Sequence, residues 1–164
     1  MAIEVRYAPS GNIRWITQHY GINGWKLKPM VIPDCARCLG IFMFWKTKKR
    51  DIPVYSVTAI HLPPPDGVKS SRKKIEKEYF KKICTHDDLD NSEPYLIILA
   101  GGKIDTPQNR THYERSLRKF VLPFGRIYPN TQIMSIPPLE KVMFTTFILD
   151  ELGVFRTKIK SLPN

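Results

Sequence analysis

The sequence has few of the features that would identify a secreted or membrane-spanning protein. It has three cysteines in 164 residues, an odd and small number that argues against a disulfide framework and favours a reducing compartment. No apolar run approaches the roughly 18 residues of a membrane-spanning helix, and the longest runs, at 39–45 and 95–102, have the length of strands. We therefore expect an intracellular protein, from the cytoplasm, the nucleus or a virion, with no transmembrane segment.

Recognisable catalytic motifs are also missing. Nucleases are the natural enzyme class for a basic chain, and many hold Mg²⁺ with clustered carboxylates beside a lysine. No Asp or Glu of this sequence has a lysine two positions later, and no His-x-His pair occurs. The acidic stretch 87–93 beside His86 has the composition of a solvated loop. We expect a protein that is not an enzyme, with a nuclease as a less favoured alternative.

Acidic residues are few compared with basic ones. The chain has 26 Lys and Arg against 15 Asp and Glu, which gives a formal net charge of +11. Such a surface concentrates polyanions and speeds their capture whatever the fold beneath it. Nucleic acid is the first partner class that this charge predicts, and an anionic membrane surface is the second.

The fold class follows from proline and from the apolar pattern. The 14 prolines favour many short elements joined by rigid turns. Alternating, β-branched or continuously apolar composition predicts strands at 3–7, 13–20, 39–45, 54–62 and 95–100. We predict an α+β fold, a single compact domain over residues 1–164 with a mixed or antiparallel sheet of short strands and two or three helices.

Helical periodicity is clearest at 72–82, where apolar and lysine side chains fall on opposite faces. A second helix is predicted at 109–121. The segment 137–153 is ambiguous, because Pro138 and Gly153 suit the two ends of a helix, whereas its VMFTTFIL stretch has strand composition. We favour a helix there, followed by an edge strand at 154–160.

Basic residues gather in three places: after the apolar strand 39–45, on helix 72–82 and on helix 109–121. The candidate nucleic-acid-binding residues are Lys46, Lys48, Lys49, Arg50, Arg72, Lys73, Lys74, Lys77, Lys81, Arg110, Arg115 and Arg118. Trp45 and Tyr113 lie among them and could stack on bases, although aromatic rings more often fill a core. We predict binding mainly through phosphates, with little sequence specificity and with RNA slightly favoured over DNA.

A structural role of another class fits the same size and charge. Small basic matrix proteins of viruses self-associate and bind an anionic membrane or a nucleoprotein, and they need no catalytic motif. Lipid binding with self-association would favour this alternative, whereas saturable binding of RNA by a monomer would favour the first.

The cysteines form one short motif. Cys35 and Cys38 have the Cys-x-x-Cys spacing that can share a metal ion or form a redox pair. A zinc site would need two more ligands, and Cys84 and His86 could supply them. Buried or incidental thiols are the commoner outcome for such residues. We expect no cofactor, with zinc as the one that these residues could hold.

Overall fold

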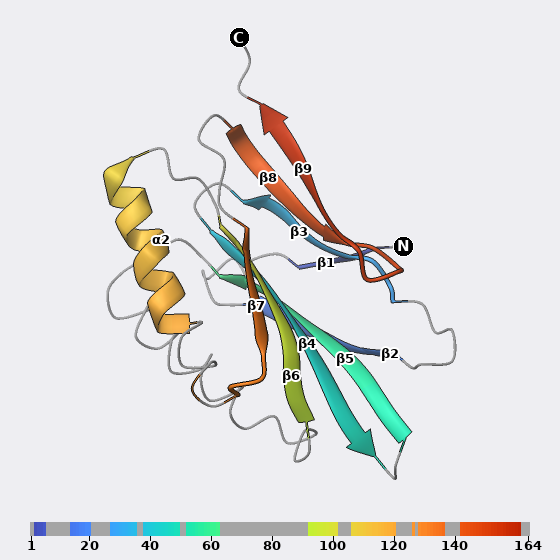
Figure 1. The fold of residues 1–164 in the computed structure, drawn as a ribbon. Coiled ribbons are helices and arrows are strands. Elements are labelled where there is room, and N and C mark those ends of the chain that lie inside the picture. Colours follow the sequence, from blue (N-terminus) through green and yellow to red (C-terminus); the bar gives the residue numbers. More distant parts are fainter. Residues whose placement is uncertain are drawn as a thin grey trace.

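The structure is a computed structural model. Two mixed β-sheets make up most of the residues that it describes (Figure 1). It describes residues 2–5, 14–20, 27–35, 38–49, 52–62, 92–101, 106–120, 126, 128–136 and 142–161. The four-stranded sheet has the order β1 (Ile3–Glu4), β3 (Met30–Cys35), β8 (Val142–Leu149) and β9 (Phe155–Ser161). The five-stranded sheet has the order β2 (Arg14–Tyr20), β5 (Ile52–Leu62), β4 (Leu39–Lys49), β6 (Ser92–Gly101) and β7 (Gln132–Ile136). The pairs β1–β3 and β6–β7 are parallel, and the other neighbours are antiparallel.

The longest pairing joins β4 and β5, from Lys49 opposite Ile52 to Leu39 opposite Leu62. Both strands are rich in aromatic and β-branched residues, which pack well on a pleated surface. The predicted strands 39–45 and 54–62 lie within them and are confirmed. Because β5 also pairs with β2, and β4 also pairs with β6, these two strands form the middle of the larger sheet.

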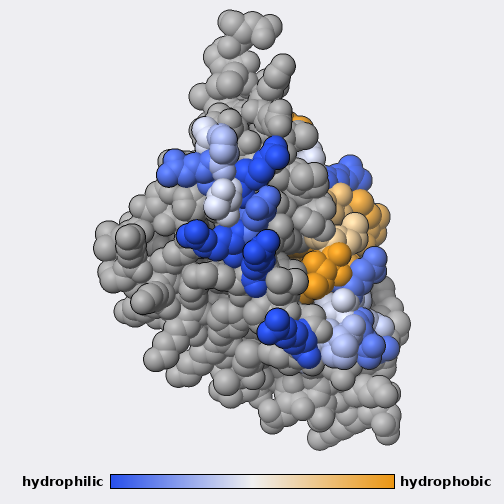
Figure 2. All heavy atoms as spheres, turned by 60° about the vertical axis from the view of Figure 1, so that its left-hand side comes forward, coloured by the Kyte–Doolittle hydropathy of each residue, from blue (hydrophilic) through white to orange (hydrophobic). Residues whose placement is uncertain are grey.

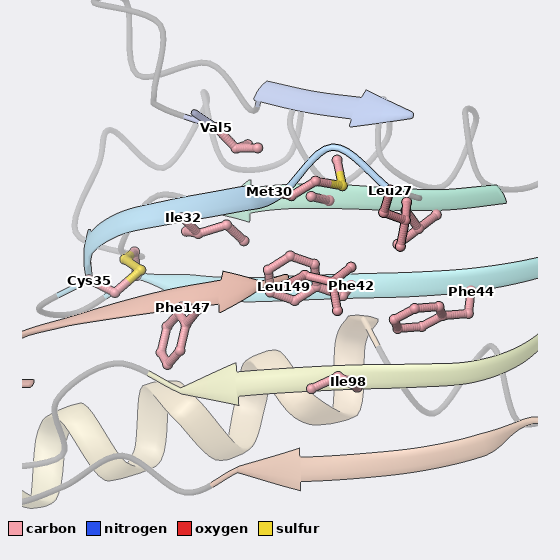
Figure 3. Packing of buried hydrophobic residues seen from close by; sticks show 13 residues of the cluster. Val5, Leu27, Met30, Ile32, Cys35, Phe42, Phe44, Ile98, Phe147 and Leu149 are labelled. Atoms are coloured by element: carbon pink, nitrogen blue, oxygen red, sulfur yellow. A yellow bond between two sulfur atoms is a disulfide. The ribbon is translucent and has the colours of Figure 1, made fainter. Parts of the chain in front are cut away.

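The main core lies between the two sheets. Phe42 of β4 meets Phe155 of β9 edge-to-face with ring centroids 5.8 Å apart, and Phe155 stacks on Phe147 of β8. Figure 3 shows the side chains of both sheets directed into this layer. The buried cluster consists of Val5, Leu27, Met30, Ile32, Cys35, Cys38, Phe42, Phe44, Val57, Ala59, Ile98, Phe147 and Leu149.

The two sheets approach each other closely at Gly40. A Cβ atom added there would lie 2.9 Å from Cδ2 of Phe147 and 3.2 Å from Cδ1 of Ile32. A glycine inside a strand often lies where another chain segment packs very closely, since it has no side chain of its own to accommodate. Gly40 therefore allows β3 and β8 to pack directly against β4.

The opposite face of β4 is buried as well. Ile41, Met43 and Trp45 of β4 alternate with the core-facing residues and are each no more than 2 % exposed. The ring of Trp45 packs edge-to-face on Tyr128, with centroids 6.4 Å apart. Residues 40–45 are thus buried on both faces of the strand, as their continuous apolar run predicts.

The predicted α+β fold class is wrong, because strands in two mixed sheets dominate the described residues. The segment 137–153, predicted as a helix, contributes strand β8 and a turn. Along β8 the side chains at 145, 147 and 149 are buried and those at 146 and 148 are partly exposed, which is strand periodicity. Gly153, interpreted as a helix end, has φ of 76° and forms part of the turn to β9.

Two other predicted elements are confirmed. Helix α2 (Pro107–Phe120) covers most of 109–121, and β9 is an edge strand that pairs only with β8 among the described strands. The predicted helix 72–82 lies outside the described residues. Within the part of the chain that the structure describes, no helix is long and apolar enough to cross a membrane.

Candidate thiol–imidazole site and arginine surface

Three potential metal ligands meet at one end of the layer between the sheets. Cys35 ends β3, Cys38 lies just before β4, and His61 lies near the end of β5, opposite Gly40. Strand alternation puts His61 on the same face as Ala59, which packs in the core between the sheets. All three side chains are buried, and their ligand atoms lie within 4.8 Å of one another.

Each ring nitrogen of His61 has a close neighbour. Its Nδ1 lies 3.0 Å from the carbonyl oxygen of Val5, and its Nε2 lies 3.6 Å from Sγ of Cys35. A carbonyl can only accept a hydrogen bond, so Nδ1 carries the proton when the ring is neutral and Nε2 has a free lone pair on the side of the sulfur. The sulfur of Cys35 is part of a disulfide and has no proton to donate to Nε2. Figure 3 shows Cys35 at the end of its strand, with its sulfur in a disulfide, which joins it to Cys38.

The environment of His61 favours the neutral ring. Burial lowers the pKa of His61 from 6.5 to about 4, although the hydrogen bond to Val5 acts in the opposite direction. The effect of burial on the pKa is the larger one, because a charged imidazolium loses its hydration between the sheets and one carbonyl only partly replaces the lost water. At neutral pH the site therefore contains an uncharged imidazole, which is the form of histidine that binds metal ions.

The predicted four-ligand zinc site stays a prediction. Cys35 and Cys38 are joined in a disulfide, and Cys84 and His86 lie outside the described residues. The disulfide counts against the predicted reducing compartment. Sequence reasoning missed His61, because its partners come from sheet pairing rather than from a short motif. The one available signal was a histidine in a strand of apolar and small residues.

A group of arginines lies on the exposed face of α2. Arg110, Arg115 and Arg118 are all exposed, and at 100° per residue they fall within an arc of about 140°. Glu114 is the one exposed acidic residue within the described helix. Figure 2 shows a group of hydrophilic side chains near the middle of the view, and a smaller hydrophobic patch to its right with further hydrophilic side chains around it. We call the three arginines the arginine face.

The other predicted nucleic-acid contacts are placed only in part. Lys46 is exposed on β4, and Lys48 and Lys49 lie at the end of that strand. Outside the described residues lie Arg50, Arg72, Lys73, Lys74, Lys77 and Lys81. Their role in binding nucleic acid therefore stays a prediction.

Basic residues on β9 were not among the predicted contacts. Arg156 and Lys158 are exposed, and Arg156 makes an ion pair of 3.3 Å with Asp150. The alternation of basic and apolar residues at 154–160 was the signal for them. They belong to the four-stranded sheet and not to α2.

No protein-family model matches the chain, and no curated protein matches its sequence.

Proposed function

We propose that the protein is a non-enzymatic nucleic-acid-binding protein that contacts phosphates, with RNA slightly favoured over DNA and with little sequence specificity. The observation that carries this proposal is the arginine face of α2, where three exposed guanidinium groups accompany a single exposed carboxylate. A net charge of +11 adds long-range attraction for any polyanion. The function requires a compartment that holds nucleic acid, such as the cytoplasm, the nucleus or a virion.

Arginine suits phosphate recognition for a geometric reason. Its planar guanidinium offers paired N–H donors that match two phosphate oxygens, and it keeps its charge at any physiological pH. Arg110 and Arg118 lie about two helical turns apart, and Arg115 lies between them along the axis. Such a row can follow the backbone of a single strand without reading its bases.

The burial of Trp45 supports phosphate contact over base stacking. Its side chain is 2 % exposed and packs on Tyr128, so the ring belongs to the core. The lysine that follows, Lys46, is exposed and can still reach a phosphate. A stacking platform needs ring faces open to solvent, which this tryptophan does not offer.

A matrix-like assembly protein is the second candidate, and the edge strand β7 favours it. Ile133 and Met134 of this strand are 37 % and 44 % exposed, and β7 pairs only with β6 among the described strands. An edge with exposed apolar side chains can pair with a second copy of the chain. Concentration-dependent sedimentation together with binding to vesicles of anionic phospholipid, and no binding of RNA, would favour this candidate.

The test compares two sets of substitutions that remove the same charge. Arg110→Gln, Arg115→Gln and Arg118→Gln together neutralise the arginine face. Lys28→Gln, Arg156→Gln and Lys158→Gln neutralise three exposed residues associated with the four-stranded sheet. The guanidinium of Arg156 is largely exposed to solvent, so loss of its pair with the partly buried Asp150 costs little stability and the second set is a fair control.

Binding of a labelled single-stranded RNA of about 20 nucleotides is measured by fluorescence anisotropy over a range of salt. Each phosphate contact to a single strand contributes about 0.7 to the slope of log K against log salt, so loss of the arginine face lowers the slope by about 2. The control set keeps a slope close to that of the unsubstituted protein. Equal effects of the two sets would show that net charge alone drives binding, and would contradict the assignment to α2.

A further inference from the structure

We propose that the reduced protein binds one zinc ion through Sγ of Cys35, Sγ of Cys38 and Nε2 of His61. The three atoms are buried and lie within 4.8 Å of one another, and they come from the end of β3, the start of β4 and the end of β5. Two thiolates and one imidazole are a donor set that zinc prefers over the hard cations. This site is independent of RNA binding by α2.

One distance already fits a bound ion. Zinc lies about 2.3 Å from sulfur and about 2.0–2.1 Å from imidazole nitrogen, so tetrahedral angles separate the two ligand atoms by about 3.6 Å. Sγ of Cys35 and Nε2 of His61 are 3.6 Å apart in the structure. The imidazole therefore needs no large movement to coordinate zinc beside Cys35.

The contact to Val5 prepares His61 for this role. Histidines that bind metals usually donate their other ring N–H to a carbonyl or carboxylate, which fixes the tautomer and the orientation of the ring. The Val5 carbonyl, 3.0 Å from Nδ1, is such a partner. It directs the lone pair of Nε2 toward Cys35 and links the site to the segment that follows β1.

Binding requires that the Cys35–Cys38 disulfide first be reduced. Two molecules of a thiol reductant supply two electrons and two protons, so that the protein gains two thiols and the reductant becomes its own disulfide. Zinc then displaces the two thiol protons to solvent and accepts the lone pair of Nε2. The other ring proton stays on Nδ1, which donates its hydrogen bond to the Val5 carbonyl. The disulfide and the zinc-bound dithiolate are thus mutually exclusive states of one site.

Zinc titration of the reduced, metal-free full chain against a chromophoric chelator tests the site. We expect one zinc per chain, and His61→Gln should weaken zinc binding by at least about 10–100-fold. The matched controls are Cys84→Ser and His86→Gln, which remove the two ligands that the sequence alone suggested. They should leave zinc affinity unchanged. Loss of binding in these controls with retention in His61→Gln would overturn the proposal, as would the absence of zinc binding by the unsubstituted chain.

A second measurement does not depend on whether His61→Gln folds. X-ray absorption of the zinc-loaded, unsubstituted protein should show two sulfur ligands and at least one imidazole nitrogen. Three sulfurs would include Cys84 and contradict the assignment, and a shell of oxygen ligands would indicate surface binding and contradict it too. Chain oxidised at Cys35 and Cys38 should bind no zinc at this site, and retention of full affinity after oxidation would refute the role of the thiolates.

Discussion

Substitution of Gly40 by alanine should destabilise the protein by pushing its two sheets apart. The new methyl group would lie 2.9 Å from Cδ2 of Phe147 and 3.2 Å from Cδ1 of Ile32, both closer than side chains normally approach. Overpacking of a dense core costs about 1–3 kcal/mol, and the lower entropy of the unfolded alanine chain offsets about 0.4–1 kcal/mol of it. We expect a net loss of about 1–2 kcal/mol in the free energy of unfolding, or about 2–8 °C in Tm.

Urea unfolding of Gly40→Ala, Phe147→Leu and the double variant measures this effect and its cause. If the clash with Phe147 is responsible, a smaller side chain at 147 relieves part of it. The double variant should then lose about 0.5–2 kcal/mol less stability than the sum of the losses in the two single variants. Phe44→Leu is the matched control, since Phe44 is four residues further along the same strand and faces the same core. Close sheet packing at Gly40 would be refuted if Gly40→Ala did not change the free energy of unfolding. It would also be refuted if the effects of Gly40→Ala and Phe147→Leu were as additive as those of Gly40→Ala and Phe44→Leu.

Two more predictions concern His61 and Gly153. Because burial lowers the pKa of His61 to about 4 from 6.5, the unfolded chain binds a proton that the folded chain does not. The stability that this group contributes is complete above pH 6.5 and is lost as the pH falls toward 4. The loss in the free energy of unfolding is about 3 kcal/mol, because each pKa unit corresponds to about 1.4 kcal/mol. Urea unfolding midpoints of the chelator-treated protein between pH 7 and 4.5 measure this loss. His61→Gln should make the midpoint depend less steeply on pH. An equally steep dependence in the variant would refute the role of His61. Gly153→Ala should lower the free energy of unfolding by about 1–2 kcal/mol, because φ of 76° at this position is unfavourable for a residue with a side chain. Gly153→Asn should lower it less, since asparagine adopts this conformation more readily. Equal urea unfolding midpoints for the unsubstituted protein and the two variants would contradict this prediction.

Strand composition predicted much of the larger sheet. The segments that became β4, β5 and β6 are apolar, aromatic or β-branched over six residues or more, and no helical period competes with that pattern. β3 was harder to recognise because Pro33 interrupts it, and proline is normally excluded from a paired strand. The structure accommodates Pro33 at a shift in register between Ile32 and Cys35.

The error at 137–153 has a physical cause. Proline and glycine mark the ends of helices and the turns between strands alike, so Pro138 and Gly153 could not decide between the two. In the structure, the carboxylate of Asp150 accepts hydrogen bonds from the amides of Leu152 and Val154, and this closes the turn before β9. Those bonds, together with the pairing of β8 with β3, determine the strand, and neither can be recognised from local composition.

The candidate sites were predictable to different degrees. Arg110, Arg115 and Arg118 follow from helical periodicity alone, because one helix positions all three. The approach of His61 to Cys35 depends on two sheets that pack face to face, which no spacing in the sequence encodes. A site assembled from three strands therefore needs the tertiary structure, whereas a site on one helix does not.

Binding of the unsubstituted protein to single-stranded RNA at 50 and 200 mM salt tests the proposed function most directly. Contacts to about six phosphates predict that a fourfold rise in salt weakens binding by about 300-fold, because each contact releases condensed counterions. Submicromolar binding at low salt that weakens in this way would support phosphate recognition by the basic surface. No detectable binding at 50 mM, or an affinity that does not change with salt, would contradict it.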